Sequence, residues 1–149
     1  LQRHMVLAYT NITHTSGEIH NGIWQRYDDG DETVHSAIMT LREMARKVAN
    51  SLTSDRRDIF IDAIRAVSAA IDDMSPELNQ AYRPLVDDLM ESKTALAWKG
   101  MGAAAGGTVA IFANHGKVEE VKAACTQAGW EIIDWNYDNE GLQRQVIET

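Results

Sequence analysis

The sequence of 149 residues contains one cysteine, Cys125, so no disulfide can form within the chain. Such sparse cysteine usage is typical of a reducing compartment, and we expect a cytoplasmic protein. Lys and Arg number 14 against 22 Asp and Glu, and the net charge of −8 argues against nucleic acid or an anionic membrane as the main partner. The sequence has no apolar run long enough to cross a bilayer and no secretory leader pattern.

Internal repeats, low-complexity tracts and linkers are also absent from the sequence. The hydrophobic content of 44% and the charged content of 24% are ordinary for a globular protein. A chain of this length can form one domain with a real core, and we treat residues 1–149 as a single domain. Leu1 stands where a start methionine would be, which suggests an excerpt from a longer polypeptide or removal of a tag.

The apolar periodicity predicts a few strands and several helices. We predict strands at 5–9, 108–113, 130–137 and 142–147. We predict helices at 18–27, 32–52, 85–93 and 117–128, and another that starts after Ser54 as its N-cap and runs to about residue 71. Pro84 predicts a kink or a restart. Helices grouped among so few strands favour an α+β fold, with the helices packed on one face of a small, mostly antiparallel sheet.

The most informative segment is the run of small residues from Gly102 to Gly107, which leads directly into the strand at 108–113. Small side chains let a backbone approach another group closely, whereas a linker would be polar. The predicted order is helix, loop, strand. A Rossmann site needs strand, glycine-rich turn and helix, so we exclude it. No Gly-Lys-Ser/Thr follows the glycines, which excludes a Walker phosphate loop.

Three segments resemble motifs of the GHMP small-molecule kinases. Lys99–Gly107 is similar to the third conserved motif of that family, in the form found in its heptose- and fucose-kinase-like branch. Tyr9–Ser16 is similar to the branch's Tyr-Thr-Gly-Ile-Ser/Thr-Arg-x-Ser loop, and Trp135–Gly141 to its closing segment. The resemblance covers nearly the whole chain. It implies a ferredoxin-like, mostly antiparallel four-stranded sheet with several helices on one face, as in the C-terminal domain of these kinases.

Some positions depart from the family pattern. Ala104 and Ala105 replace glycines of the third motif, and Trp98 stands where the family has a small residue. In the first loop, Asn11 replaces a glycine and His14 replaces an arginine. A methyl group on each of two loop residues narrows the approach open to a ligand or a neighbouring loop. These departures bear on which substrate the protein takes.

Kinases of this family hold the nucleotide-phosphate loop, the catalytic residue and the Mg²⁺-binding side chains in an N-terminal domain, and this sequence contains none of those motifs. The resemblance therefore implies the C-terminal, substrate-side half of an ATP-dependent sugar kinase that is not active alone. It implies ATP and Mg²⁺ for the complete enzyme and no cofactor, metal or catalytic residue for this chain. The implied partners are an N-terminal kinase domain, on the same polypeptide or a separate chain, and a small heptose-like sugar. A homodimer is compatible with this arrangement.

Two sets of residues are candidates for the site. Backbone amides in the loop can support a phosphate or brace a neighbouring phosphate loop, and this role is assigned to Gly102, Ala103, Gly106 and Gly107. The alternative is that small residues only allow tight packing. Hydroxyl, imidazole and ammonium groups suit a polyol or a phosphate, and substrate binding is assigned to Thr10, Thr13, His14, Ser16 and Lys99. Alternatively, the polar side chains of the first loop only stabilise turns and cap the helix that follows. Lys99 could likewise be a solvated lysine at the end of a helix.

Other candidates are weaker. Glu18, His20 and His14 do not have a diagnostic metal spacing, and we predict no metal site. Cys125 and Trp98 are interpreted as core residues. A non-catalytic ferredoxin-like module that binds a small ligand or a protein is an alternative function, and it would bind without a second half. A helical interaction scaffold is a third possibility, which predicts a large exposed apolar face.

Overall fold

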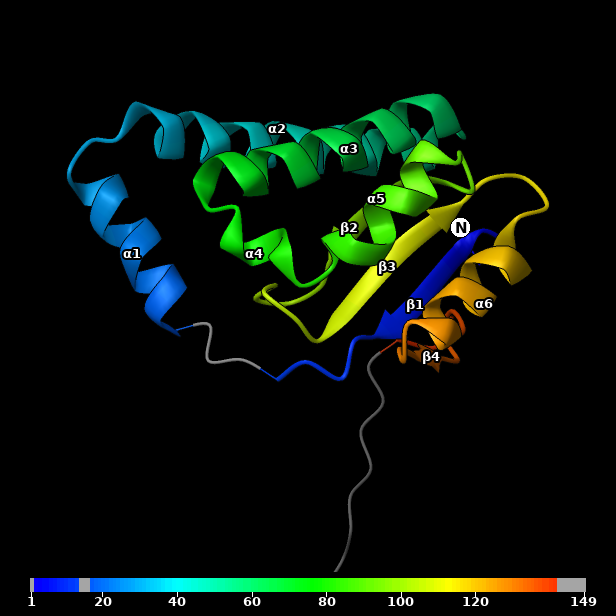
Figure 1. Cartoon of the computed structure of the whole chain (residues 1–149). Coiled ribbons are helices and arrows are strands. Elements are labelled where there is room, and N and C mark those ends of the chain that lie inside the picture. The colour runs from blue at the N-terminus through cyan, green and yellow to red at the C-terminus, as the bar shows by residue number, and fades with distance from the viewer. Residues whose placement is uncertain (1, 14–16, 142–149) are drawn as a thin grey trace, which may run out of the picture.

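The computed structural model describes residues 2–13 and 17–141, and it contains four strands and six helices in that part of the chain (Figure 1). In chain order the elements are β1 (Met5–Tyr9), α1 (Gly17–Asp28), α2 (Glu32–Thr53), α3 (Arg57–Met74), α4 (Glu77–Gln80), α5 (Arg83–Glu91), β2 (Ala95–Gly100), β3 (Thr108–Ala113), α6 (Val118–Gln127) and β4 (Glu131–Ile133).

The four strands form one sheet in the order β2-β3-β1-β4, and every pairing is antiparallel. Leu7 in the centre of β1 lies opposite Ala110 of β3 on one side and Ile133 of β4 on the other. A crossover of five helices separates β1 from β2, and α6 separates β3 from β4. This is the split β-α-β arrangement of a ferredoxin-like α+β fold. The predicted fold class is therefore confirmed.

The helix predicted at 85–93 is confirmed as α5, but the strand that lies between this helix and the small-residue loop was not predicted. Helix α5 ends at Glu91, and β2 then occupies Ala95–Gly100. The sequence Ala-Leu-Ala-Trp-Lys-Gly carries few of the residues that favour strands. Ala95 and Ala97 form a strand here because both are buried, at 3% and 0% exposure. The loop therefore joins two strands, and the absence of a helix after it still excludes a Rossmann site.

Two further boundaries differ from the predictions. Ser54 is the C-cap of α2, with its N–H donating to the Asn50 carbonyl, and α3 begins after Arg56 instead. Of the strand predicted at 130–137, only Glu131–Ile133 forms a strand, which is β4. The strand predicted at 142–147 lies outside the described residues. Pro84 stands in the first turn of α5, so the predicted restart is confirmed.

Helices α5 and α6 lie against one face of the sheet (Figure 1). Their buried residues Val86, Leu89, Val121 and Cys125 share one core with the strand residues Val6, Ala8, Val109 and Ile111. Burial of this apolar surface is the main force that holds the layer to the sheet, at roughly 25 cal/mol per Å². Burial also raises the pKa of the Cys125 thiol to about 11, so this residue behaves as the core residue that was predicted.

Helix α3 lies along the free edge of β2. The Arg65 Nε donates to the Leu96 carbonyl at 2.6 Å, and the Ser68 hydroxyl donates to the Trp98 carbonyl at 2.5 Å. These side chains satisfy carbonyls that an edge strand otherwise presents to solvent or to another chain. Because β2 is fixed in this way, the loop that follows Gly100 starts from a rigid position.

Among the described residues, no helix is both long and apolar enough to cross a bilayer.

Candidate functional site

The site predicted from the sequence is the loop between β2 and β3, and the structure divides it into an open part and a buried part. Met101, Gly102 and Ala103 are exposed, whereas the next three residues, 104–106, are buried. The strand ends on either side are joined by a hydrogen bond from the Met101 N–H to the Thr108 carbonyl at 2.8 Å. The loop is therefore a hairpin connection with its first half at the surface and its second half in the core.

The backbone of this loop is left-handed at most positions. The φ angles are +63° at Gly102, +60° at Ala104, +60° at Ala105, +138° at Gly106 and +71° at Gly107. An L-residue in the left-handed region costs about 1–2 kcal/mol relative to glycine. The two alanines therefore adopt the conformation for which the resembled motif uses glycine.

The amides of the loop fall into two groups. The N–H of Ala105 donates to the Leu78 carbonyl at 2.6 Å, and the N–H of Gly107 donates to the Ile12 carbonyl at 3.1 Å. By contrast, the N–H groups of Gly102 and Ala103 have no acceptor within residues 2–13 and 17–141. Both residues are exposed, so two adjacent amide donors are free to bind an oxygen of a ligand.

Tyr82, between α4 and α5, holds the buried half of the loop. Its side chain is 0% exposed, and its hydroxyl donates to the Gly106 carbonyl. The same oxygen accepts from the Gly106 N–H at 3.2 Å. Burial raises the pKa of the Tyr82 hydroxyl, so the group stays protonated and keeps its donor. The ring also lies 5.8 Å from that of Trp98, which is 7% exposed and is the core residue that was predicted.

Gly100, the last residue of β2, lies directly over the Tyr82 ring. A Cβ atom at Gly100 would be 2.7 Å from Cε2 of Tyr82. We expect Gly100→Ala to lower the free energy of unfolding by about 1–3 kcal/mol, because the fully buried ring has no free space to move into. Chemical denaturation measures this effect. Gly22→Ala is the control: it lies in α1 with open space around the new methyl group, and we expect it to stabilise by about 0.5–1 kcal/mol. Equal stabilities of Gly100→Ala and the wild type would contradict the proposed contact.

The first loop, after β1, lies against the small-residue loop. The N–H of Thr10 donates to the Gly107 carbonyl at 2.9 Å, which complements the bond from Gly107 to Ile12. The Thr10 side chain is 4% exposed, and its hydroxyl accepts from the Ile12 N–H at 3.2 Å, so it closes a local turn. Asn11, where the resembled motif has glycine, has a φ of +59°. Asparagine tolerates this conformation better than most residues.

The other predicted substrate-binding residues are placed as follows. Thr13 is exposed at the end of the described part of the first loop. His14 and Ser16 lie outside the described residues. Lys99 is half-buried on β2, its Nζ donates to the Gly100 carbonyl at 2.8 Å, and burial lowers the pKa of its ammonium group. The structure therefore brings Thr10 and Thr13 near the loop and gives Thr10 a local structural bond, while the substrate roles stay predictions.

His20 is a site residue that the sequence analysis did not assign to the loop. Its Nε2 lies 3.0 Å from the Ala103 carbonyl, which places the first turns of α1 over the exposed half of the loop. The only sequence signal for this contact was the position of His20 near the start of a helix that follows the first loop. Within the described residues, no group of three His, Cys, Asp or Glu side chains is arranged to hold a metal ion.

The geometry of the loop is compatible with binding of an anionic group. Free amides beside a hairpin can bind an anionic oxygen, because successive backbone N–H groups in a turn can form a concave donor surface, and here Gly102 has a positive φ angle while Ala103 does not. The arrangement supplies electrostatic stabilisation and positioning, which are what phosphoryl transfer needs most from a protein.

No protein-family model matches this sequence, and a search of the curated proteins finds no match. Solved structures do match the fold. A Lin0012 protein from Listeria innocua superposes over 89% of this chain with a TM-score of 0.78 at 10% sequence identity. Phosphomevalonate kinase from Streptococcus pneumoniae, solved with phosphomevalonate and AMPPNP, superposes over 87% with a TM-score of 0.66 at 18% identity. Mevalonate kinase from L. major, solved with R-mevalonate, superposes over 84% with a TM-score of 0.63 at 12% identity.

The chain spans 38%, 38% and 37% of the lengths of these three proteins, respectively. At these sequence identities, the similarity shows that the fold is shared and nothing more. Two of the three proteins are kinases of the GHMP group, the group that the loop motifs resemble. The chain therefore has the fold of a part of mevalonate and phosphomevalonate kinases that makes up less than two-fifths of each enzyme.

Proposed function

We propose that this chain is the C-terminal, substrate-side half of an ATP-dependent small-molecule kinase. The observation that carries the proposal is the pair of free, exposed amides at Gly102 and Ala103, held at the tip of a rigid left-handed loop. The shared fold with two kinases and the resemblance of three segments to GHMP motifs support the same conclusion. The loop donates hydrogen bonds to a phosphate, or to the phosphate loop of an N-terminal lobe that completes the site.

In this proposal the chain positions the phosphate and the acceptor, and the partner lobe supplies the nucleotide site, the Mg²⁺ ligands and the catalytic residue. ATP and Mg²⁺ belong to the complete enzyme, where the metal neutralises charge on the transferred phosphoryl group. The free loop amides fit a phosphate oxygen, but no metal-binding cluster is found in the part of the chain that the structure describes. Following the resemblance to the GHMP kinases, we place the Mg²⁺ ligands and the catalytic residue on the N-terminal lobe. Gly106 and Gly107 fix the loop, and Gly102 and Ala103 face the phosphate.

A small sugar is the proposed acceptor. Thr13, His14 and Ser16 would offer hydroxyl groups and an imidazole to a polyol, and the resemblance to the heptose- and fucose-kinase-like branch points to the same class. The superposed kinases were solved with R-mevalonate and with phosphomevalonate, so these acids are the competing acceptors.

Phosphoryl transfer with and without the partner lobe tests the proposal. The chain is expected to transfer no phosphoryl group from ATP–Mg²⁺ when alone, and to do so once it is combined with an N-terminal kinase domain, whether that domain belongs to the same polypeptide or to a separate chain. The acceptors to compare are a heptose, L-fucose, R-mevalonate and phosphomevalonate, with turnover expected for a sugar. Turnover by the chain alone, or none with the lobe present on any acceptor, would contradict the kinase-half function. Turnover with mevalonate only would overturn the sugar assignment and leave the kinase function standing.

A further inference from the structure

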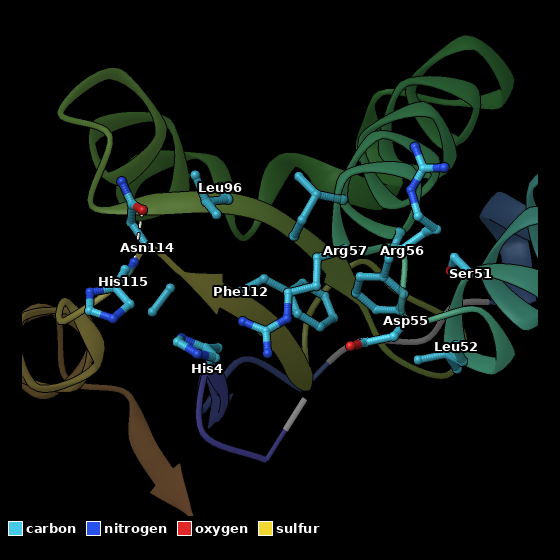
Figure 2. Close-up of a pocket in the computed structure, with 13 residues that line it drawn as sticks. His4, Ser51, Leu52, Asp55, Arg56, Arg57, Leu96, Phe112, Asn114 and His115 are labelled. Carbon is cyan, nitrogen blue, oxygen red and sulfur yellow. Dashed lines mark hydrogen bonds between the residues drawn. The ribbon is translucent and has the colours of Figure 1, made fainter.

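A pocket of about 240 Å³ lies at the far end of β3 from the small-residue loop, and the proposed function does not use it (Figure 2). Its walls come from His4 before β1, the connection from α2 to α3, and Phe112–His115 at the end of β3. An engineered cavity of about 150 Å³ holds benzene. The pocket therefore has room for a ligand with an apolar part the size of benzene and a small polar group attached to it.

One side of the pocket is apolar. The rings of Phe60 and Phe112 meet edge to face at 5.1 Å and form its floor, and Leu96 and Ile61 line it as well. Leu52 also lines the pocket and is 52% exposed. Apolar groups at a pocket wall in contact with water favour a ligand with an apolar body.

The other side carries one guanidinium group and two imidazole rings. The rings of His4 and His115 lie 6.3 Å apart between centroids, and the Arg57 guanidinium points toward His4 (Figure 2). Within the described residues, none of these three side chains makes a hydrogen bond or an ion pair. The neighbouring Arg56 differs, because it binds Asp58 through two hydrogen bonds of 3.0 and 2.6 Å. Three nitrogen-bearing groups therefore converge on one place with free donor capacity.

The charge around the pocket is uneven. Burial, and after it the nearby charge of Arg57, lower the pKa of the His4 imidazole, so this ring offers a nitrogen donor while Arg57 carries the permanent positive charge. Asp55 lies on the opposite side of the pocket, beside Leu52 (Figure 2). Its carboxylate would repel a second negative group at that end, so the pocket suits a ligand with a single anionic end.

We propose that this pocket binds a small organic anion, with an apolar body on the Phe60–Phe112 floor and one phosphate or carboxylate group among His4, Arg57 and His115. The spacing of the two imidazoles fits an oxygen that bridges them. With N–H···O distances of about 2.8 Å, such an oxygen would lie roughly 4 Å from each ring centre. Two ring centres 6.3 Å apart can share an atom at that distance.

Calorimetric titration of the 149-residue chain tests this site with phenyl phosphate, benzoate, inorganic phosphate and benzyl alcohol. Phenyl phosphate has both the body and the head group, inorganic phosphate only the head, and benzyl alcohol only the body. We expect phenyl phosphate to bind about tenfold or more tightly than either partial ligand. Benzoate binding would show that carboxylates are accepted, and its absence would restrict the site to phosphates. Equal binding of phenyl phosphate and inorganic phosphate, or no binding of phenyl phosphate, would overturn the proposal.

Variants locate the binding. Arg57→Gln and His115→Gln change exposed side chains, so the fold is expected to survive, as thermal unfolding will verify. Each should weaken phenyl phosphate binding by about fivefold or more, because each removes a charge-assisted donor. Arg42→Gln removes the same charge from the exposed side of α2, away from the pocket, and should change binding by less than about twofold. A similar loss in Arg42→Gln and Arg57→Gln would show only non-specific charge attraction and would contradict the site.

Discussion

Replacement of Tyr82 by Phe is expected to lower the free energy of unfolding by about 2–4 kcal/mol. The variant keeps the ring and removes the hydroxyl that donates to the Gly106 carbonyl and accepts from its N–H. Gly106 is buried, so both of its backbone groups would be left without a partner, and each such group costs about 1–3 kcal/mol. For a chain of this size the melting temperature should fall by roughly 5–15 °C.

Tyr27→Phe is the matched control for this prediction. The Tyr27 ring stacks on His35 at 4.0 Å, and its hydroxyl has no hydrogen-bond partner in the part of the chain that the structure describes. We expect Tyr27→Phe to change stability by less than about 0.5 kcal/mol. Amide hydrogen exchange should also become faster at Ala105 and Gly106 in Tyr82→Phe and remain unchanged in Tyr27→Phe. Similar stabilities for the two variants would show that Tyr82 does not hold the loop.

If the proposed kinase function holds, Gly102→Val is expected to reduce phosphoryl transfer by the complete enzyme about 100-fold or more while leaving the chain folded. A valine side chain at this exposed position would block the approach of a phosphate to the neighbouring amides, and loss of one such donor costs about 10²–10³ in rate. The φ of +63° also strains a β-branched residue, which lowers stability by about 1–2 kcal/mol.

Gly30→Val separates the effect of strain from the effect on the site. Gly30, between α1 and α2, is also exposed, has a φ of +81° and has open space where a Cβ would lie. The two variants should therefore lose similar stability, whereas only Gly102→Val should lose turnover. Full activity in Gly102→Val would leave tight packing as the only role of the small residues.

The sequence contained enough information for the fold class because the long helices have clear apolar stripes. It did not predict β2, because Ala95 and Ala97 carry no strand preference and form a strand only where the folded core buries both of them. Tertiary packing decided this element, as is common for short strands. Because β2 was missed, a helix was expected before the loop and a strand after it, whereas the loop joins two strands, β2 and β3.

The candidate site was predicted in part. The small residues identified the loop, and the left-handed backbone explains why small residues are needed there. Tyr82 and His20 contact the loop across 24 and 83 residues of sequence, respectively, and no local pattern marks either contact. The pocket near His4 was not predicted for the same reason, since its charged groups come from three distant segments that only the fold brings together.

The most direct test of the proposed phosphate contact is the ¹H–¹⁵N spectrum of this chain combined with the proposed N-terminal kinase domain, recorded with and without AMPPNP–Mg²⁺. We expect the amide signals of Gly102 and Ala103 to move downfield when the nucleotide binds, because both amides would then donate to a phosphate oxygen. The signal of Ala105, whose N–H is already bonded to Leu78 at 2.6 Å, should move much less. Unchanged signals at both Gly102 and Ala103 in the nucleotide-bound enzyme would contradict the claim that this loop faces a phosphate.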